Sequence, residues 1–409
     1  MLILKWFASS TVRHAWQAAK HVGKILDHQR DLLTPEAVAS VTGAVEGTLA
    51  ACRTGDKAAI TATLERLEKD ANKWLRPFPH SAWRENVEVA LVSIAVAMSV
   101  RTFFLQPFKI PTGSMQPTLF GVTQEDLRGQ ENVKIPGGVA GFFDYWFNGV
   151  SYFHVVAKAD GVLTYDEPSK LVLFNIKQNY KINGEPQPPV WFPPDGNYGR
   201  AGLFGRADVP QGAMVRAGED IVKMRVVSGD HLFVDRVTFN LRRPERGDIV
   251  VFETHGITRL PRDQQDTYYI KRLVATGGET VQIGDDRHLR INGQRLDANT
   301  PHFEFLYSFD TNQPPTDSKF SGHVNEVVAN HFGRGHLAPN FLNQSNKYIM
   351  PPRHYLVMGD NTVNSSDGRA WGDFPQERVI GKSFFVYWPI GGTTFNGEER
   401  TSRFGWAHR

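Results

Sequence analysis

Two residues of this chain could together carry out nucleophilic catalysis, Ser114 and Lys271. Ser114 lies in the stretch LQPFKIPTGSMQPTLFG, residues 105–121, where Pro111 and Pro117 stiffen the chain on both sides of it. A serine hydroxyl is a poor nucleophile until a neighbouring base removes its proton. A lysine amine can be that base if burial lowers its pKa, because desolvation disfavours the ammonium form.

Lys271 lies in TYYIKRLVATGGE, a segment whose β-branched and aromatic residues predict a strand. Alternation along a strand turns Lys271 to the same face as Tyr269 and Leu273. A lysine in a half-buried strand is usually an edge residue or one that snorkels to water, so the segment alone does not distinguish a base from a structural residue.

Other catalytic signatures are missing from the sequence. There is no G-x-S-x-G elbow, no H-E-x-x-H helix and no phosphate-binding G-x-x-x-x-G-K-[ST] loop, and Pro117 takes the lysine position of an S-x-x-K motif at Ser114. The single cysteine, Cys52, excludes an intrachain disulfide or a cysteine-based zinc site, and we interpret it as a small apolar residue of a helix. None of the 14 histidines falls in a metal-ligand pair. We therefore predict no metal and no other cofactor; a histidine-based triad stays open at this point.

The chain is long enough, at 409 residues, for two or three structural units. Its net charge of only +3 gives no global reason to bind nucleic acid, so we predict no such partner. Residues 1–84 are predicted to form a helical cytoplasmic region, since Ile60, Leu64 and Leu67 recur at helical spacing. The opening MLILKWFASS is too short and too interrupted for a signal peptide, and indicates an amphipathic helix or a helical hairpin.

The stretch NVEVALVSIAVAMSVRTFFLQPF, residues 86–108, predicts one transmembrane helix over 85–107. Its ionisable residues lie near its ends, where they can reach the interface; a buried core helix is the alternative. Basic residues and interface aromatics precede it: Lys73, Arg76, Arg84, Trp74 and Trp83. The positive-inside rule therefore places the N-terminus in the cytoplasm and everything after residue 108 outside.

Residues 108–390 are predicted to form an extracytoplasmic antiparallel β-domain. Short runs such as GDIVVFE and SFFVYW, punctuated by glycine and proline, are typical of hairpin-rich β structure. The pair Asn292-Gly293 suits a tight hairpin turn. Two long stretches interrupt the pattern, residues 122–224 and 300–350, and we interpret them as insertions or a subsidiary β-subdomain. We interpret residues 391–409 as a C-terminal tail.

The order of five segments resembles bacterial type I signal peptidase (leader peptidase), the family of serine proteases with a Ser/Lys dyad. The segments are RTFFLQPFKIPTGSMQPTL after the apolar run, then SGDHLFVDR, RPERGDIVVF, YYIKRLVATGGE and MGDNTVNSSDGRAWGDFP. The resemblance covers roughly 102–121, 228–284 and 354–390. It implies a mainly β fold with inserted β-rich subdomains, preceded by the helical region and one transmembrane helix.

The resemblance also implies roles for particular residues. By position, Ser114 is the nucleophile and Lys271 the general base, while Thr112 and the Ser114 N–H form the oxyanion hole. Thr112 has a plainer alternative, a local backbone hydrogen bond that caps the turn. The remaining matches are supporting residues: Ser365, which orients the lysine amine, the ion pair of Asp367 with Arg369, and Arg272. Departures from the family pattern occur at Thr362, Val363 and Gly368, and at ATGGE where the family has a proline.

The implied function is that of a membrane-bound serine endopeptidase, signal peptidase I. It would remove N-terminal signal peptides from exported preproteins after small residues of the A-x-A type. The implied location is the inner membrane, with the catalytic domain on the periplasmic side. Signal peptides, the lipid bilayer and a nearby secretion translocon would be its partners. Two alternative functions are consistent with part of this evidence. One is a self-cleaving regulator with the same dyad, as in SOS-response repressors, and the other is a non-catalytic binding scaffold. Cleavage of a precursor that is lost in Ser114→Ala would distinguish the endopeptidase from these alternatives.

Overall fold

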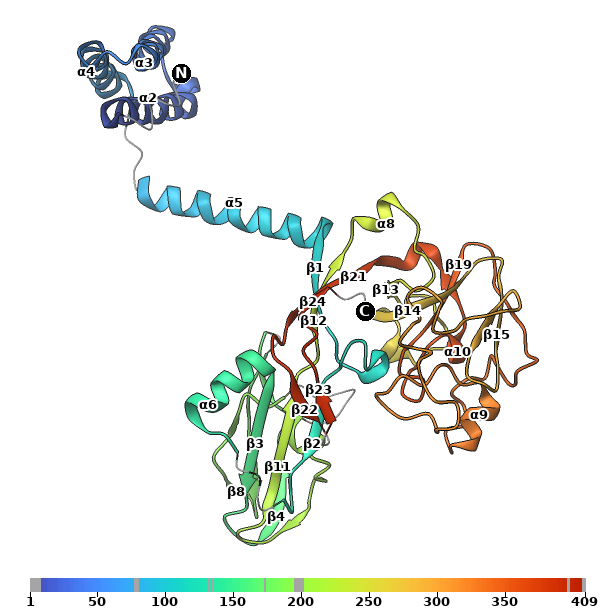
Figure 1. The fold of residues 1–409 in the computed structure, drawn as a ribbon. Helices are drawn as coiled ribbons and strands as arrows, with labels where there is room; N and C mark the ends of the chain where they lie inside the picture. The colour runs from blue at the N-terminus through green and yellow to red at the C-terminus, as the bar shows by residue number, and fades with distance from the viewer. Residues whose placement is uncertain are drawn as a thin grey trace. The chain divides into compact units, whose positions relative to one another are not determined.

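The computed structural model describes residues 9–76, 81–130, 133, 135–172, 174–194, 202–395 and 398–406 (Figure 1). The chain divides into two compact units, Met1–Ala95 and Val96–Arg409. Residues 1–8, which hold most of the predicted N-terminal amphipathic segment, lie outside the described residues.

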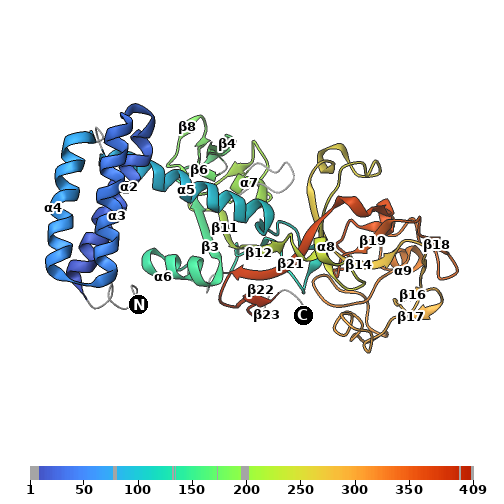
Figure 2. The ribbon, with the colours of Figure 1, turned by 90° about the horizontal axis from the view of Figure 1, so that it is seen from above.

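The first unit is helical, as the sequence predicts. Its helices are α2 (Ser10–Gln29), η1 (Arg30–Leu32), α3 (Pro35–Thr54) and α4 (Lys57–Trp74), and α2, α3 and α4 pack against one another (Figure 2). Each long helix starts at a capping side chain, because Ser9, Thr34 and Asp56 accept hydrogen bonds from backbone N–H groups two or three residues later. Gly55, in a left-handed conformation, ends α3.

The predicted apolar face of this unit is confirmed. Ile60 and Leu67 are buried and Leu64 is half-buried. Cys52 is fully buried beside Val12, as a small apolar residue would be. Burial of these side chains against neighbouring helices, more than helix propensity, stabilises helices of this length.

The apolar helix α5 (Ser81–Phe103) follows. Its segment Trp83–Phe103 is long and apolar enough to cross a membrane, judged by length and composition, and none of it is buried in the described structure. That exposure argues against the alternative of a buried core helix. The helix ends four residues before the predicted position 107, because Pro107 disfavours helical geometry and Leu105–Lys109 instead form strand β1.

The main sheet of the second unit is antiparallel and has the strand order β1–β12–β21–β13–β14–β19–β20, with β24 added to β21. Its strands are β1 (Leu105–Lys109), β12 (His231–Asp235), β13 (Ile249–Glu253), β14 (Tyr268–Thr276), β19 (His354–Met358), β20 (Phe374–Pro375), β21 (Val379–Trp388) and β24 (Gly405–Trp406). Short helices lie between them: η2 (Gly113–Met115), α8 (Thr238–Leu241), η4 (Arg262–Gln264), α10 (Gly368–Trp371) and η5 (Gln376–Arg378). Pro107 is tolerated in β1 because β1 ends the strand order.

Both faces of this sheet are covered. Alternate residues of β13 point to opposite sides, so Ile249 and Val251 join one buried cluster while Val250 and Phe252 join another. The register sets Val250 opposite Lys271, and Arg272 opposite Met358. The strand that carries the candidate base is therefore enclosed between two neighbouring strands.

The insertion at 122–224 folds as a β-rich subdomain with its own core, which includes Leu163, Phe204 and Val222. Its sheets have the orders β2–β11–β3, β10–β4–β7–β8 and β5–β6–β9. The elements are β2 (Thr123–Asp126), α6 (Gly138–Phe143), η3 (Asp144–Asn148), β3 (Val150–Val156), β4 (Gly161–Tyr165), β5 (Ser169–Leu171), β6 (Phe174–Gln178), β7 (Tyr180–Ile182), β8 (Glu185–Pro186), β9 (Val190–Trp191), α7 (Gly202–Arg206), β10 (Met214–Val215) and β11 (Asp220–Val227).

The remaining elements lie in and after the second insertion. A sheet of order β17–β16–β15–β18 combines β15 (Thr280–Ile283), β16 (Leu289–Ile291), β17 (Gln294–Arg295) and β18 (Tyr348–Ile349), and α9 (Glu326–His331) precedes β18. The predicted turn at Asn292-Gly293 is confirmed: both residues have positive φ, and Ile291 pairs with Gln294. In the tail, β22 (Thr393–Phe395) pairs with β23 (Glu398–Arg400).

Candidate active site

The loop that carries Ser114 is fixed against the core. Ser114 lies in η2 and is only 7% exposed, and the neighbouring Met115 and Leu119 are buried among the hydrophobic residues of the main sheet. A Cβ on Gly121 would lie 2.2 Å from the Thr112 carbonyl oxygen, so this close approach of backbone to backbone requires glycine. The serine is thus presented by a loop with little freedom to move.

The structure brings Lys271 onto Ser114, 157 positions away in the chain. The Lys271 Nζ lies 2.7 Å from the Ser114 Oγ, and it donates a second hydrogen bond to the Ile270 carbonyl oxygen at 3.1 Å. The ammonium also lies 5.2 Å from the centre of the Tyr269 ring, which agrees with the predicted shared face. Burial lowers the pKa of Lys271 to about 8, although the carboxylates of Asp367 and Asp360 favour its charged form.

Asp367 and Arg369 form a buried ion pair next to this dyad. Both side chains are fully buried, and the Arg369 Nε and Nη2 donate to the two Asp367 oxygens at 2.9 and 2.8 Å. Burial alone would raise the pKa of Asp367, but the Arg369 charge holds it below its ordinary value. The Gly359 N–H also donates to Asp367, at 2.9 Å. The pair thereby ties α10 to the chain that follows β19.

Arg272 forms a second buried ion pair, with Asp360. The Arg272 Nε and Nη2 donate to the two Asp360 oxygens at 2.8 and 2.6 Å, and Nη1 donates to the carbonyl oxygens of Gly247 and His302. Thr118, in the loop after Ser114, donates its hydroxyl proton to the same carboxylate. Because each arginine is matched by a carboxylate, Lys271 stands beside two pairs that are neutral overall.

Ser365 lies near these groups without a hydrogen bond to Lys271. Its hydroxyl is buried and has no hydrogen-bond partner of standard geometry among the described residues. It does lie close enough to Asp367 to help lower the pKa of that carboxylate. Gly359 separates Ser365 from the catalytic loop, since a Cβ on Gly359 would lie 2.2 Å from the Ser365 Oγ and 2.4 Å from the Ser114 carbonyl oxygen.

Thr112 is the extended residue immediately before η2. Its φ and ψ are −119° and 155°, and its side chain makes no capping hydrogen bond to η2. The geometry thus gives no support to the capping alternative and leaves the hydroxyl for another partner.

Several contacts around Ser114 were not predicted from the sequence. The Asn361 N–H donates to the Ser114 carbonyl oxygen at 3.1 Å, and the Asn361 Nδ2 donates to the Gly113 carbonyl oxygen at 3.0 Å and to Asp317 at 2.6 Å. The second insertion, which contains Asp317, therefore touches the site. Asp360 and Asn361 belong to the segment MGDNTVNSSDGRAWGDFP, so their place in that motif was the available signal.

The C-terminal tail also holds the catalytic loop. Arg403 donates to both oxygens of the buried Asp230, at 2.6 and 2.5 Å, and Asp230 accepts the Phe120 N–H at 2.7 Å. The guanidinium groups of Arg400 and Arg403 lie 4.3 and 4.1 Å from the centre of the Phe120 ring. This clamp of the tail on Phe120 reaches the loop six residues after Ser114.

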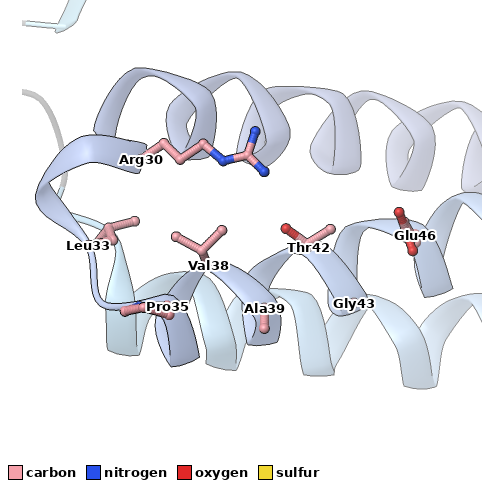
Figure 3. Close-up of a pocket in the computed structure, with 8 residues that line it drawn as sticks. All are labelled: Arg30, Leu33, Pro35, Val38, Ala39, Thr42, Gly43 and Glu46. Carbon is pink, nitrogen blue, oxygen red and sulfur yellow. The ribbon is translucent and has the colours of Figure 1, made fainter.

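One pocket of the described residues lies away from these side chains. It has a volume of about 610 Å³ and lies in the N-terminal unit, where Figure 3 shows Arg30 reaching over a groove that Val38 and Thr42 face. None of the candidate catalytic residues lines it.

Together, the fold and these contacts define a class: a mainly antiparallel β protein in which a buried serine lies within hydrogen-bond distance of a lysine of lowered pKa. Part of the chain is similar to a known family. Residues 219–388 match the family described as signal peptidase, peptidase S26. The predicted resemblance to bacterial type I signal peptidase is thereby confirmed.

The chain is also similar to individual proteins. The chain is 28% identical over 161 residues to signal peptidase I of Leptolyngbya laminosa, a match that covers 39% of this chain and 61% of the relative. It is 29% identical over 188 residues to signal peptidase I of Aquifex aeolicus, covering 39% of this chain and 69% of that one. A solved signal peptidase I from Enterococcus faecalis aligns over 34% of this chain and 97% of its own, at 25% identity and a TM-score of 0.22.

These matches cover part of each protein. The first of these relatives is matched over about three fifths of its length. The family match begins at residue 219, so it includes Lys271, Asp367 and Arg369 but not Ser114. The link from Ser114 to this family therefore depends on the resemblance of residues 102–121 and on the contact of Ser114 with Lys271.

Proposed function

We propose that this protein is a membrane-anchored signal peptidase I, a serine endopeptidase that removes signal peptides from exported preproteins. The observation that carries the proposal is the 2.7 Å approach of Ser114 Oγ to the buried Lys271 Nζ, next to a region that matches the signal peptidase family. A serine paired with a base within hydrogen-bond distance is the requirement for an activated nucleophile.

In the acylation step, neutral Lys271 takes the proton of the Ser114 hydroxyl while Oγ attacks the carbonyl carbon of the scissile bond. The Lys271 ammonium then gives this proton to the leaving nitrogen, and the C–N bond breaks. The signal peptide remains as an ester on Ser114, and the mature protein leaves with a new amino terminus. A pKa of about 8 suits both halves of this transfer near neutral pH.

Deacylation repeats the same proton movements with water. Lys271 accepts a proton as the water oxygen attacks the ester carbonyl, and it returns that proton to Ser114 Oγ as the ester bond breaks. The cleaved signal peptide then has a free carboxyl group, and the dyad is restored to its starting protonation state.

We assign the oxyanion hole to the Ser114 N–H and the Thr112 hydroxyl. Negative charge develops on the carbonyl oxygen in both steps, and preorganised donors stabilise it. The Thr112 hydroxyl makes no capping hydrogen bond to η2, which supports this role. The Asn361 contacts to the carbonyl oxygens of Gly113 and Ser114 would keep this loop in the required conformation.

The supporting residues act by holding the dyad in place. The Asp367–Arg369 and Arg272–Asp360 pairs rigidify the chain segments around Lys271 without adding net charge. For Ser365 we propose orientation of the lysine amine, a contact that would form once substrate settles the position of the amine. Its buried hydroxyl, which has no hydrogen-bond partner of standard geometry among the described residues, supports such a role.

We propose that the substrate binds as an added strand. β1 ends the order of the main sheet and its last residue, Lys109, leads directly toward the catalytic loop, so an extended peptide paired along β1 would arrive at Ser114. Small residues at the −1 and −3 positions of the signal peptide would fill shallow apolar pockets, giving A-x-A specificity.

The proposed location is the inner membrane, crossed once by α5, with the β-domain on the periplasmic side near the secretion translocon. The candidate span Trp83–Phe103 supports this orientation, with Lys73 and Arg76 before it and Arg84 at its start. Protease added to intact spheroplasts should digest the β-domain and spare residues 9–76. Digestion of the helical region instead would reverse the topology.

The activity is tested with the full chain in detergent and an exported preprotein. We expect a shortened product whose new amino terminus follows an A-x-A sequence, and none from Ser114→Ala or Lys271→Met. Ser308→Ala is the matched control and should cut normally, because Ser308 is exposed and its hydroxyl donates to the Phe305 carbonyl oxygen, away from the candidate site. Cleavage by a folded Ser114→Ala variant would refute the proposal.

A further inference from the structure

A loop of the second insertion lies against the catalytic loop. Asp317 and Ser318 belong to the stretch PPTDSKF, residues 314–320, which lies outside the stretches that resemble type I signal peptidase. The Asp317 carboxylate accepts a hydrogen bond from the Asn361 Nδ2 at 2.6 Å, and the Ser318 hydroxyl donates to the Gln116 Oε1 at 2.6 Å. These two contacts tie the insertion to the catalytic loop and to the side chain that braces it.

The Gly113 carbonyl oxygen is held by two donors. The Asn361 Nδ2 donates to it at 3.0 Å, and the Gln116 N–H donates to it at 3.1 Å. This carbonyl and the Ser114 N–H belong to one planar peptide unit, so fixing the oxygen also fixes the direction in which the N–H points. A carbonyl that accepts hydrogen bonds also makes the N–H of its own peptide unit a stronger donor. The contacts at Gly113 therefore act on one of the two proposed oxyanion donors.

Asp317 determines which way the Asn361 amide faces. Asn361 is fully buried, and its Nδ2 donates to two groups that only accept, the Gly113 carbonyl and the Asp317 carboxylate. Rotation of the amide by half a turn would place its oxygen against both acceptors. The Asn361 Oδ1 has no hydrogen-bond partner among the described residues, which is unfavourable for a buried acceptor. The charge-assisted hydrogen bond to Asp317 offsets this cost and keeps the nitrogen toward Gly113.

The Ser318 contact holds the other end of η2. Gln116 follows η2 and is 2% exposed, and its amide folds back over Gly113, since a Cβ on Gly113 would lie 2.7 Å from the Gln116 Oε1. Ser318 has a φ of 65°, a left-handed conformation that few serines adopt. Such conformations persist where the surrounding contacts enforce them. The insertion thus braces η2 at its first residue, through Asn361, and just after its last, through Gln116.

We propose that Asp317 is a positioning residue for the peptidase reaction, which acts through Asn361 on the peptide unit that contains the Ser114 N–H. It keeps this N–H aimed at the carbonyl oxygen on which negative charge develops, and it takes no part in proton transfer. Asp317 itself is exposed, so its carboxylate reaches the oxyanion hole only through the buried Asn361. The inference rests on the proposed function, in which the Ser114 N–H is an oxyanion donor. It gives the second insertion a task in catalysis.

The test compares variants of the full chain in steady-state cleavage of a signal-peptide substrate. Asp317→Ala removes the acceptor of the Asn361 amide, whereas Asp317→Asn keeps an oxygen that can accept the same hydrogen bond. Asp310→Ala is the matched control, because Asp310 is an exposed aspartate of the same insertion whose carboxylate accepts from the Asn312 N–H within its own turn. The denaturation midpoint of each variant is measured alongside, and kinetics are recorded where the variant is folded.

We expect Asp317→Ala to lower kcat by about tenfold to a hundredfold while KM stays within about twofold, because an oxyanion donor acts in the transition state and not in substrate binding. Asp317→Asn should recover most of this loss. The bend of kcat/KM near pH 8 should stay in place in both variants, since the base Lys271 is unchanged. Asp310→Ala should match the wild type.

Wild-type kinetics in Asp317→Ala would overturn the proposal. A loss carried by KM, a loss of equal size in Asp310→Ala, or no recovery in Asp317→Asn would also overturn it, because each indicates a general loosening of the insertion. A displaced pH bend would overturn it as well, since Asp317 would then act on the base. Failure of the wild type to cut the substrate is a different result, which would refute the proposed function and this inference with it.

Discussion

Cleavage should rise with pH and level off near pH 8, because Lys271 must be neutral to accept the Ser114 proton. Burial lowers the pKa of this amine from 10.5 to about 8. At pH 7 about one molecule in ten then holds a neutral lysine, against about one in three thousand for an unperturbed amine. The structure therefore accounts for roughly a 300-fold gain in the reactive fraction at neutral pH.

The assay is kcat/KM for a signal-peptide substrate measured from about pH 6 to 10. We expect the logarithm of kcat/KM to rise with a slope of one and bend at about pH 8. Lys271→Arg, which stays charged throughout this range, should be inactive at every pH. A rate that still climbs in proportion to hydroxide at pH 10 would show that the pKa of the base is not lowered.

The same lowered pKa also predicts how the free energy of unfolding changes with pH. Between pH 8 and 10.5 the folded lysine is neutral while the unfolded one still binds a proton, so the wild-type free energy of unfolding rises with pH across this window. Lys271→Met has no such group. The free energy of unfolding of Lys271→Met minus that of the wild type should therefore fall by about 3 kcal/mol as the pH passes through the window. A constant difference in denaturant unfolding would contradict the assigned pKa.

Other substitutions test the surrounding groups. In steady-state kinetics, Thr112→Val should lower kcat by about 10²–10³-fold, while the kcat of Thr112→Ser should stay within about tenfold of the wild type. Near-normal turnover in the valine variant would assign the oxyanion role to another group. Arg369→Met leaves the buried Asp367 carboxylate unpaired, so the free energy of unfolding should fall by about 3–5 kcal/mol, and adding Asp367→Leu should restore most of it. Arg403→Met breaks the clamp on Asp230 and Phe120 and should lower kcat several-fold, with partial rescue by Arg403→Lys; unchanged kinetics would make the tail a purely peripheral element.

The sequence predicted the features that depend on local pattern. Hydrophobic spacing indicated the buried face of Ile60 and Leu67, and Asn292-Gly293 indicated its hairpin turn, because both follow from a few neighbouring residues. The sequence placed the end of the transmembrane helix at residue 107, four residues beyond the end of α5 at Phe103. There the pairing of β1 with β12, which an apolar run does not reveal, decides where the helix stops.

Contacts between distant segments were harder to predict. Ser114 and Lys271 could be paired only through the order of motifs, since 157 residues separate them. The partner of Arg272, Asp360, lies 88 residues away, and the tail residue Arg403 binds Asp230 across 173 residues. Such pairs are set by strand register and loop packing, which a single sequence does not specify.

The central claim is that Ser114 attacks the scissile carbonyl, and trapping the acyl-enzyme tests it most directly. Full-length protein mixed with a signal-peptide substrate and quenched rapidly in acid should gain the mass of the signal-peptide fragment less one water. Peptide mapping should then place the ester on Ser114, and the adduct should be missing from Ser114→Ala. Cleavage without any adduct, or an adduct mapped to another residue, would contradict the account.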